Sequence, residues 1–305
     1  MRVAIVGGSG LLGRHIAAAL RARDDDVLIL SRDPDRARRK GVSDAVAAWV
    51  PGDPAGLASA IHGADAVVNL AGVAVGPRPW TRRRRQAILE SRVIATRTVA
   101  RAIAVLPAAA RPTVLVNASG TDAYTGRDSV AATESTPPSA GFLARVCLAW
   151  EAEANRARAS ETRVVVLRIG FVLAPGATAL RLLAVPFRLG LGGPIGNGRQ
   201  WMSWIHLDDL VGLVLFALDD PRVDGIVNAV GPVPARQSDV AAAIGAALGR
   251  PSWLRVPATA VQLAMHDQST LVLGSRRIVP ARAVELGFRF SWRDLRTAMA
   301  DALAR

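Results

Sequence analysis

A glycine-rich turn directly after the first expected strand constrains the fold of this chain more than any other feature. Residues 3–6 are an apolar run typical of a buried strand, and an amphipathic helical pattern runs from Leu11 to about Arg23. The turn between them consists of Gly7, Gly8, Ser9, Gly10, Leu11, Leu12 and Gly13. Such glycines let the backbone approach a pyrophosphate, whose charge lies at the helix N-terminus. Their position inside a strand–turn–helix unit predicts a dinucleotide site, in preference to a tight turn without a ligand.

Strand and helix patterns alternate along the first 170 residues. We expect strands over residues 3–6, 27–30, 45–50, 66–70, 114–117 and 164–167, and helices over 11–23, 34–40, 54–61, 81–105 and 140–159. Short apolar strands separated by helices favour a parallel sheet covered on both faces. Right-handed crossovers then make the fold α/β and doubly wound, of the Rossmann type.

The pattern changes after Arg168. Gly- and Pro-rich stretches, above all residues 190–198, indicate loops rather than packed elements. Helical patterns follow at 208–218, 238–248, 258–266 and 292–303, with a strand at 226–229. We predict a Rossmann dinucleotide-binding domain over residues 1–170, with segments near 200–230 returning to it. A smaller substrate-covering lobe over 171–305 would end in a small C-terminal domain at about 251–305.

The end of the second expected strand distinguishes between the two nicotinamide dinucleotides. An NAD protein usually has a carboxylate there, which accepts hydrogen bonds from the ribose 2′-hydroxyl. Here Ser31 and Arg32 precede Asp33, and Arg36 follows one turn later. An arginine fork suits a 2′-phosphate, so NADP(H) is favoured over NAD(H). A register slip of one residue would instead present the Asp33 carboxylate and favour NAD(H).

Further cofactor contacts are expected at the next two strand ends. Asp53 is a candidate for contact with the adenine. The segment Leu70, Ala71 and Gly72 would pass beneath the adenosine ribose. All four residues also fit ordinary turn positions.

The net charge of +13 raises the question of a nucleic-acid partner. The basic residues are almost all arginines scattered along the chain, and the dense cluster Arg82–Arg85 is interpreted as a solvated helix face. With one tyrosine and no interleaving of aromatic and basic residues, the chain has no stacking platform for single strands. We therefore predict no nucleic-acid partner. A basic balance suits an acidic or phosphorylated small substrate equally well.

Cysteine usage and hydropathy suggest the compartment. Cys147 is the only cysteine, which excludes an intrachain disulfide and fits a reducing cytoplasm. No apolar run approaches the roughly 18 residues needed to span a bilayer, and no secretory signal precedes the first strand. We predict a cytoplasmic protein without a membrane partner.

Several segments beyond the glycine turn resemble the extended short-chain dehydrogenase/reductases. These are residues 69–72, Ser119 after the fifth strand and residues 204–209. More narrowly, the chain resembles the atypical "epimerase family" branch related to sugar-nucleotide epimerases, through residues 80–81, 91–92, 186–200, 256–260 and 286–290. The resemblance spans essentially the whole chain. It implies that the glycine turn binds NADP(H) and that the loops after Arg168 close over a substrate.

The pair of residues that catalyses the usual reaction of that superfamily is missing. Ordinary members use a Ser, a Tyr that exchanges a proton with the substrate, and a Lys four residues later that depresses the Tyr pKa. The only tyrosine here is Tyr124 and the only lysine is Lys40, so no Tyr-x-x-x-Lys pair exists. Alignment puts Leu143 and Cys147 at those positions. By resemblance, the atypical branch shares this loss.

Ser119 and Tyr124 are the catalytic candidates, and Ser119 would also lie beside the cofactor. Tyr124 follows Ser119 by five residues, at the carboxyl edge of the sheet where ligands bind. Without a nearby lysine its phenol should stay protonated and act as an acid or hydrogen-bond donor. A loop aromatic that packs on the nicotinamide or on the second lobe is an equal alternative. Cys147 is expected to pack in the helix, with a thiol facing the nicotinamide as the alternative.

Arg199 and His206 are the substrate-side candidates. By resemblance, Arg199 lies in a loop that approaches the nucleotide part of the substrate, and a guanidinium suits a phosphate. His206 could contact the substrate, although a structural hydrogen bond is favoured, and Asp208 and Asp209 are expected to cap the next helix. The four histidines show no metal-ligand spacing, so we predict no metal.

Two functions remain in view. The favoured one is an NADP(H)-dependent oxidoreductase or epimerase acting on a small phosphorylated or nucleotide-linked molecule, as a monomer or homodimer. The alternative is a non-catalytic NADP(H)-binding sensor or regulatory protein, suggested by the missing Tyr–Lys pair. An RNA-binding regulator is least favoured. The fold cannot decide between them, because function depends on the site.

Overall fold

A seven-stranded parallel sheet in the order β10-β6-β5-β4-β1-β2-β3 forms the centre of the computed structural model, which describes residues 1–39, 45–76, 78–124 and 130–304. Its strands are β1 (Arg2–Val6), β2 (Asp26–Ser31), β3 (Val46–Ala48), β4 (Ala66–Asn69), β5 (Val114–Gly120), β6 (Arg163–Ile169) and β10 (Gly225–Ala229). The order reverses between β1 and β4, and ligands of such sheets bind at this reversal, outside the carboxyl ends of the strands. The predicted doubly wound fold is confirmed, and β10 brings a segment from beyond residue 170 into the sheet.

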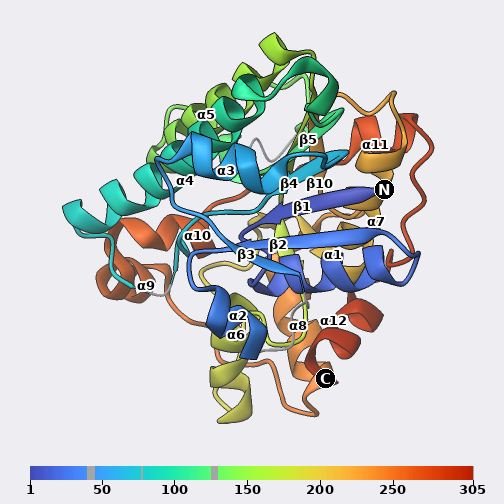
Figure 1. Cartoon of the computed structure of the whole chain (residues 1–305). Coiled ribbons are helices and arrows are strands. Elements are labelled where there is room, and N and C mark those ends of the chain that lie inside the picture. Colours follow the sequence, from blue (N-terminus) through green and yellow to red (C-terminus); the bar gives the residue numbers. More distant parts are fainter. Residues whose placement is uncertain (40–44, 77, 125–129, 305) are drawn as a thin grey trace.

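Helices cover both faces of the sheet (Figure 1). On one face lie α1 (Leu11–Arg21), α2 (Pro34–Arg39) and α7 (Leu207–Asp219), and on the other lie α3 (Pro54–Ile61), α4 (Arg82–Val105) and α5 (Phe142–Asn155). Strand β1 shows why: Val3 and Ile5 join the first apolar cluster, whereas Ala4 and Val6 join the second. Because side chains alternate along a strand, a strand buried on both faces must be apolar throughout.

The later part of the chain adds short strands and seven further helices or helical turns to the described structure. The strands are β7 (Phe171–Leu173), β8 (Trp201–Met202), β9 (Trp204–His206) and β11 (Ala235–Arg236). The helices are α6 (Thr178–Arg188), α8 (Gln237–Ala247), α9 (Ala258–Met265), η4 (His266–Ser269), α10 (Thr270–Leu273), α11 (Ala281–Glu285) and α12 (Leu295–Ala304). Three more 3-10 turns, η1 (Ala108–Ala110), η2 (Thr121–Ala123) and η3 (Arg156–Ser160), flank β5 and α5.

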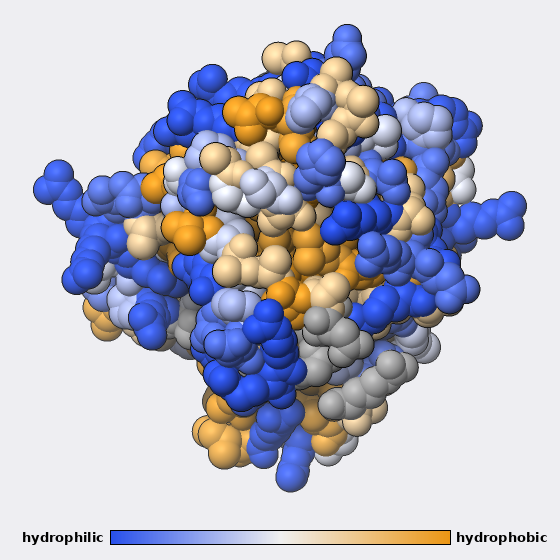
Figure 2. All heavy atoms as spheres, in the orientation of Figure 1, coloured by the Kyte–Doolittle hydropathy of each residue, from blue (hydrophilic) through white to orange (hydrophobic). Residues whose placement is uncertain are grey.

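Helix α6 differs from the expectation of loops after Arg168. Pro186 lies inside its last turn, where the missing N–H loses one backbone hydrogen bond. Burial of Leu180, Ala184 and Phe187 on the inner face offsets that loss. The outer face carries Leu182 and Val185, which are 52% and 45% exposed, and apolar atoms over α6 are visible at the lower end of Figure 2.

The arginine cluster at the start of α4 is only partly the solvated face that we expected. Arg82 and Arg83 are exposed, but Arg84 and Arg85 are half-buried. Arg84 donates to the Ala74 carbonyl, and Arg85 forms an ion pair with Asp267. The loop before α4 is therefore held to α4 by a hydrogen bond, and the segment after α9 is held to α4 by an ion pair.

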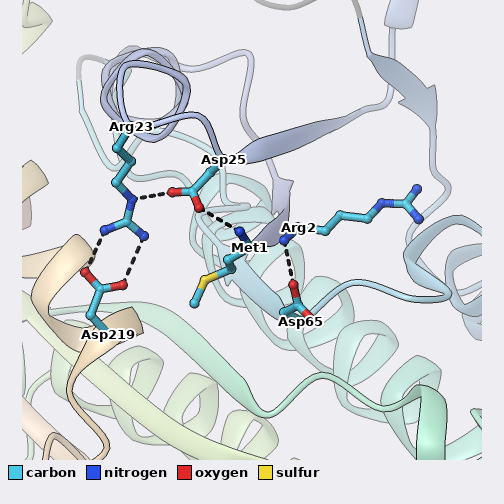
Figure 3. Close-up of polar contacts among 6 residues, drawn as sticks. All are labelled: Met1, Arg2, Arg23, Asp25, Asp65 and Asp219. Carbon is cyan, nitrogen blue, oxygen red and sulfur yellow. Dashed lines mark hydrogen bonds and ion pairs between the residues drawn. The ribbon is translucent and has the colours of Figure 1, made fainter.

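A charged network joins α1, β2 and α7 at the amino ends of the strands (Figure 3). The Met1 ammonium donates to Asp25 at 2.9 Å, and the Arg23 guanidinium pairs with Asp25 and with both oxygens of Asp219, at 2.6 and 3.0 Å. This network stabilises the sheet edge opposite the glycine turn. Within the described ranges, no helix is both long and apolar enough to cross a membrane.

Candidate functional site

The glycine turn after β1 brings the start of α1 against the sheet. Gly7 has a φ of +78°, and a Cβ atom there would lie 3.1 Å from the Leu70 carbonyl carbon. At Gly13 a Cβ atom would lie 2.5 Å from the Gly8 Cα, closer than any real contact. Only glycine therefore allows the turn, the helix and the end of β4 to pack this closely.

The N-terminus of α1 has donors available for a ligand. Its N-cap residue is Gly10, which has no side chain to accept a hydrogen bond from the first N–H groups of the helix. The first N–H groups of a helix have no partner within the helix, and the helix dipole makes this end electropositive. The turn thus has the shape and charge expected of a diphosphate site, and the residues present fit a dinucleotide cofactor.

A cavity of about 340 Å³ opens beside this turn. Of the predicted site residues, its walls include Gly7, Gly10, Leu11, Leu12, Gly13, Leu70 and Ser119, while Gly8 and Ser9 lie within the same turn. Its walls also include residues that we had not predicted, notably Arg92, Asp122, Val146 and Trp150. The cavity thus extends from the glycine turn, where the cofactor diphosphate is expected, to the end of β5, where the catalytic candidate Ser119 lies.

The end of β2 presents both arginine and carboxylate side chains to solvent. The Ser31 hydroxyl and the Asp33 backbone hydrogen bond to each other, and the Asp33 carboxylate accepts the Arg36 N–H at 2.9 Å. Asp33 therefore caps the start of α2. The side chains of Arg32 and Arg36 are both exposed beside it. Asp33 is exposed as well, but its carboxylate is engaged with the backbone of α2, so the arginine alternative is the expectation carried forward.

Asp53 and the segment after β4 have structural partners. The Asp53 carboxylate accepts the Gly56 N–H at 2.9 Å and caps α3, which is the ordinary turn role left open above. After β4, the Ala71 N–H donates to the buried Asn69 side chain, and Gly72 approaches Arg92 so closely that a Cβ atom would lie 3.2 Å from it. Asn69 thus fixes the path of Leu70 and Ala71 beneath the cavity.

Ser119 belongs to a buried ion-pair network that the sequence did not reveal. Its hydroxyl donates to Glu151 Oε1 at 2.6 Å, and Arg168 forms two hydrogen bonds to the same carboxylate at 2.8 and 2.7 Å. All three residues are at most 5% exposed. Burial alone would lower the pKa of Arg168, but the hydrogen bonds and charge of Glu151 outweigh burial and raise it. The Ser119 proton is thereby committed to Glu151, so an oxygen lone pair is left as its ligand-binding group.

Tyr124 is buried outside the cavity walls. It is 2% exposed, its ring lies under the Arg168 guanidinium, and its hydroxyl donates to Asn228 Oδ1 at 2.9 Å. The Asn228 side chain in turn donates to the Val279 carbonyl at 3.1 Å. Burial raises the pKa of Tyr124, so the phenol stays protonated as expected. Its proposed role as a proton donor to substrate does not fit this geometry, because the hydroxyl is already engaged within the protein.

Leu143 and Cys147 line the cavity from α5, at the positions aligned with the missing Tyr and Lys. Burial raises the pKa of the Cys147 thiol to about 12. A thiol that is neutral at physiological pH cannot supply the positive charge of a lysine. The side chains from α5 therefore give the cavity an apolar wall where ordinary members have an acid–base pair.

The two predicted substrate residues lie away from these walls. The Arg199 side chain is exposed in the loop before β8, and its carbonyl accepts a hydrogen bond from Arg236. His206 is buried, its ring packs on Trp292 with centroids 4.1 Å apart, and its Nε2 lies 3.2 Å from Asp301. His206 also caps α7. The structural alternative for His206 thus fits, whereas its contact with substrate does not.

The acidic residues after His206 hold the C-terminal part of the chain. Asp209 accepts the N–H groups of Ser291 and Trp292, at 2.8 and 3.0 Å. Asp209 therefore binds the backbone of a distant segment, and the expectation that Asp208 and Asp209 cap the helix is wrong because His206 is the residue that caps α7. Across the part of the chain that the structure describes, no group of three or more His, Cys, Asp or Glu side chains could hold a metal ion.

Taken together, the Rossmann sheet, the glycine turn and the cavity define the class: a protein with the fold of the extended short-chain dehydrogenase/reductases and a turn typical of dinucleotide sites. Residues 3–230 match the model of the NAD dependent epimerase/dehydratase family, and residues 256–302 match a domain of unknown function, DUF1731. The chain belongs to this epimerase/dehydratase family, in the atypical branch of epimerase family proteins that carry the C-terminal domain.

Relatives cover the chain from end to end. Epimerase family protein SDR39U1 of Mus musculus is 35% identical over 308 residues, with all of both chains covered. The chloroplastic SDR39U1 homolog of Arabidopsis thaliana is 36% identical, covering 98% of this chain and 86% of its own length. A crystal structure of human epimerase family protein SDR39U1 (isoform2) with NADPH superimposes with a TM-score of 0.90 at 32% identity, and each chain is fully covered.

Proposed function

We propose that this protein is an NADP(H)-dependent oxidoreductase or epimerase acting on a small molecule bound beside Ser119. The observation that carries the proposal is the cavity itself, which places the glycine turn and Ser119 on the walls of one space. Support also comes from the human relative that was crystallised with NADPH. The N–H groups at the start of α1 would hold the diphosphate, and Arg32 and Arg36 would bind the 2′-phosphate.

Bound NADP(H) would supply or accept a hydride, and the protein would handle the proton. Ser119 Oγ accepts the hydrogen bond of a substrate hydroxyl, because its own proton lies on the 2.6 Å contact with Glu151. As the substrate oxygen loses its proton to Ser119 Oγ, the Ser119 proton moves to Glu151 Oε1. Arg168 holds the Glu151 carboxylate in place through two hydrogen bonds. This Ser–Glu relay replaces the function of the missing Tyr–Lys pair.

A non-catalytic NADP(H) sensor is the second candidate. The observation that favours it is the wall formed by Leu143 and Cys147, which carries no group able to exchange a proton at neutral pH. Under this alternative, Ser119 would only orient the nicotinamide.

Cofactor preference is tested by binding. We expect Arg32→Ala to weaken NADPH binding by about tenfold or more, and NADH binding much less, because only NADPH carries the phosphate that the guanidinium would pair with. Arg181→Ala, which removes an exposed arginine from α6, is the control. Equal losses for the two cofactors would show that Arg32 does not bind the 2′-phosphate.

Catalysis is tested by turnover of NADPH, and of NADP+ in the reverse direction, with a panel of carbonyl compounds, alcohols and sugar nucleotides. We expect Ser119→Ala to lose turnover while still binding NADPH. Turnover that is unaffected by Ser119→Ala would contradict the relay. Tight NADPH binding without turnover of any member of the panel would favour the sensor.

A further inference from the structure

The outer face of α6 carries large apolar side chains that point into solvent. Leu182, Val185 and Leu189 follow one another at spacings of three and four residues, so they lie on one side of the helix. A helix of a globular protein usually turns its apolar stripe to the core, and α6 already buries its opposite side there. Packing within the described structure therefore does not explain this second apolar stripe.

The loop after α6 and the segment after α8 extend the apolar area. The Leu191 N–H donates to the Pro186 carbonyl at 2.9 Å, which folds the loop back onto the helix, and the Trp253 N–H donates to the Gly192 carbonyl at 3.1 Å. Exposed apolar patches with a polar rim are typical of sites that bind a protein or a membrane. The α6 surface is defined as five residues, all at least 45% exposed: Leu182, Val185, Leu189, Leu191 and Trp253.

The segments that form the α6 surface carry only positive charge. Residues 162–207 contain no Asp or Glu, and neither do residues 240–266. Four exposed arginines belong to these segments, two on α6 and two beside Trp253: Arg181, Arg188, Arg250 and Arg255. Such a surface repels a second copy of itself and attracts an anionic partner. The net charge of +13, which the glycine-turn cavity does not explain, acts in the same direction.

We propose that the α6 surface binds the anionic surface of a lipid bilayer. Leucine and tryptophan side chains enter the boundary between headgroups and acyl chains, and the arginines beside them pair with lipid phosphates. A bilayer fits better than an acidic protein, because it accepts side chains that project from a helix and two loop segments without offering a matching pocket.

This proposal replaces our expectation that the protein has no membrane partner. That expectation rested on the lack of a segment able to span a bilayer, and a protein that lies on the membrane surface needs no such segment. The proposal is independent of the proposed function, because the five residues of the α6 surface are outside the walls of the glycine-turn cavity.

The test is sedimentation of the full chain with vesicles of phosphatidylcholine alone, and of phosphatidylcholine mixed with phosphatidylglycerol. We expect binding to the anionic vesicles only, and weaker binding as salt rises, because salt screens the arginine charges. Leu189→Ser should weaken this binding about tenfold, since the leucine side chain would no longer be transferred out of water. Arg188→Gln should weaken it about fivefold, which corresponds to roughly 1 kcal/mol per basic residue near an anionic membrane.

Matched controls change the same residue types on α4. Val105→Ser removes an exposed apolar side chain at the end of that helix, and Arg83→Gln removes an exposed arginine near its start. Both should leave vesicle binding unchanged, and all four variants should keep the wild-type thermal midpoint because the positions are exposed. Trp253 supplies a direct readout: tryptophan fluorescence should shift to shorter wavelength on the anionic vesicles, and Trp253→Leu should still bind but lose most of that shift.

Several results would overturn the proposal. One is a wild type that sediments with neither kind of vesicle, or equally with both. Another is a loss for Arg83→Gln as large as that for Arg188→Gln, because net charge alone would then account for binding. Equal binding by Leu189→Ser and Val105→Ser would remove the role of the apolar side chains. Self-association that Leu189→Ser abolishes, in a protein that binds no vesicles, would assign the α6 surface to a second copy instead. None of these measurements uses NADPH, so a failure of the proposed function would leave them unaffected.

Discussion

Replacement of Glu151 by glutamine perturbs the buried network beneath Ser119 with a minimal change in shape. The substitution removes the carboxylate charge and leaves Arg168, which is 2% exposed, without its counter-ion. Breaking a buried ion pair by removing one partner costs about 3–5 kcal/mol, because the remaining charge is uncompensated. Glutamine keeps one acceptor oxygen, so we expect a loss near the lower limit, about 3 kcal/mol.

The assay is urea unfolding followed by circular dichroism. With a urea dependence of roughly 3 kcal/mol per M for a chain of this size, the loss corresponds to a midpoint lower by about 1 M. The double variant Glu151→Gln/Arg168→Met also removes the unpaired Arg168 charge, so it should recover most of the stability. Glu153→Gln, on the same helix, is the control: the Glu153 pair with Arg97 reaches solvent, and its loss should shift the midpoint far less.

Two results would refute this reasoning. A Glu151→Gln midpoint no lower than that of Glu153→Gln would show that the Glu151–Arg168 pair is not desolvated as the geometry indicates. A double variant that loses the sum of the two single losses would show that Glu151 and Arg168 contribute independently.

Two further predictions concern the glycine turn and the amino-end network. Gly13→Ala should destabilise the protein by about 1–3 kcal/mol and impair NADPH binding, because the new Cβ would lie 2.5 Å from the Gly8 Cα. Gly212→Ala is the control, because its Cβ would make only ordinary contact with Phe288. Equal thermal midpoints for the two variants would contradict the close packing at Gly13. Burial alone would raise the pKa of Asp25, but the Met1 ammonium and Arg23 outweigh burial and lower it. The stabilisation by Asp25 is therefore present above its unfolded pKa of about 3.9 and lost as pH falls below it. Asp25→Asn should flatten the fall of the thermal midpoint between about pH 5 and pH 2, and an unchanged slope would exclude this contribution.

The sequence predicts the sheet well because its signals are local. Each strand is a short apolar run, and the glycine turn follows directly after β1, so strand order and cofactor edge follow from general rules of α/β folds. Helix α6 was missed because Pro186 reads locally as a helix break, whereas the packing of Phe187 and its neighbours on the core decides the outcome. Local sequence patterns carry no information about such long-range packing.

The chemistry of the cavity was harder to predict. The Tyr124 hydroxyl is engaged by Asn228, which lies 104 residues away in sequence, and no spacing rule connects the two residues. Arg92 and Trp150 come from the middle of helices, where an arginine or a tryptophan is typical of any amphipathic pattern. One signal was available: Arg168 is a charge at the end of an otherwise apolar strand, and a buried arginine requires an acidic partner such as Glu151.

The contacts of Asn228 have a consequence for how this protein can be divided. The first family match ends at residue 230 and the second begins at residue 256, which suggests two separable domains. Yet Asn228 joins Tyr124, on the first side, to the Val279 carbonyl on the second. Since Tyr124 packs on Arg168, which binds Glu151 and thus Ser119, a chain truncated before residue 251 would lose a support of the buried network at Ser119. The C-terminal domain is therefore expected to be indispensable for the stability of the buried network at Ser119.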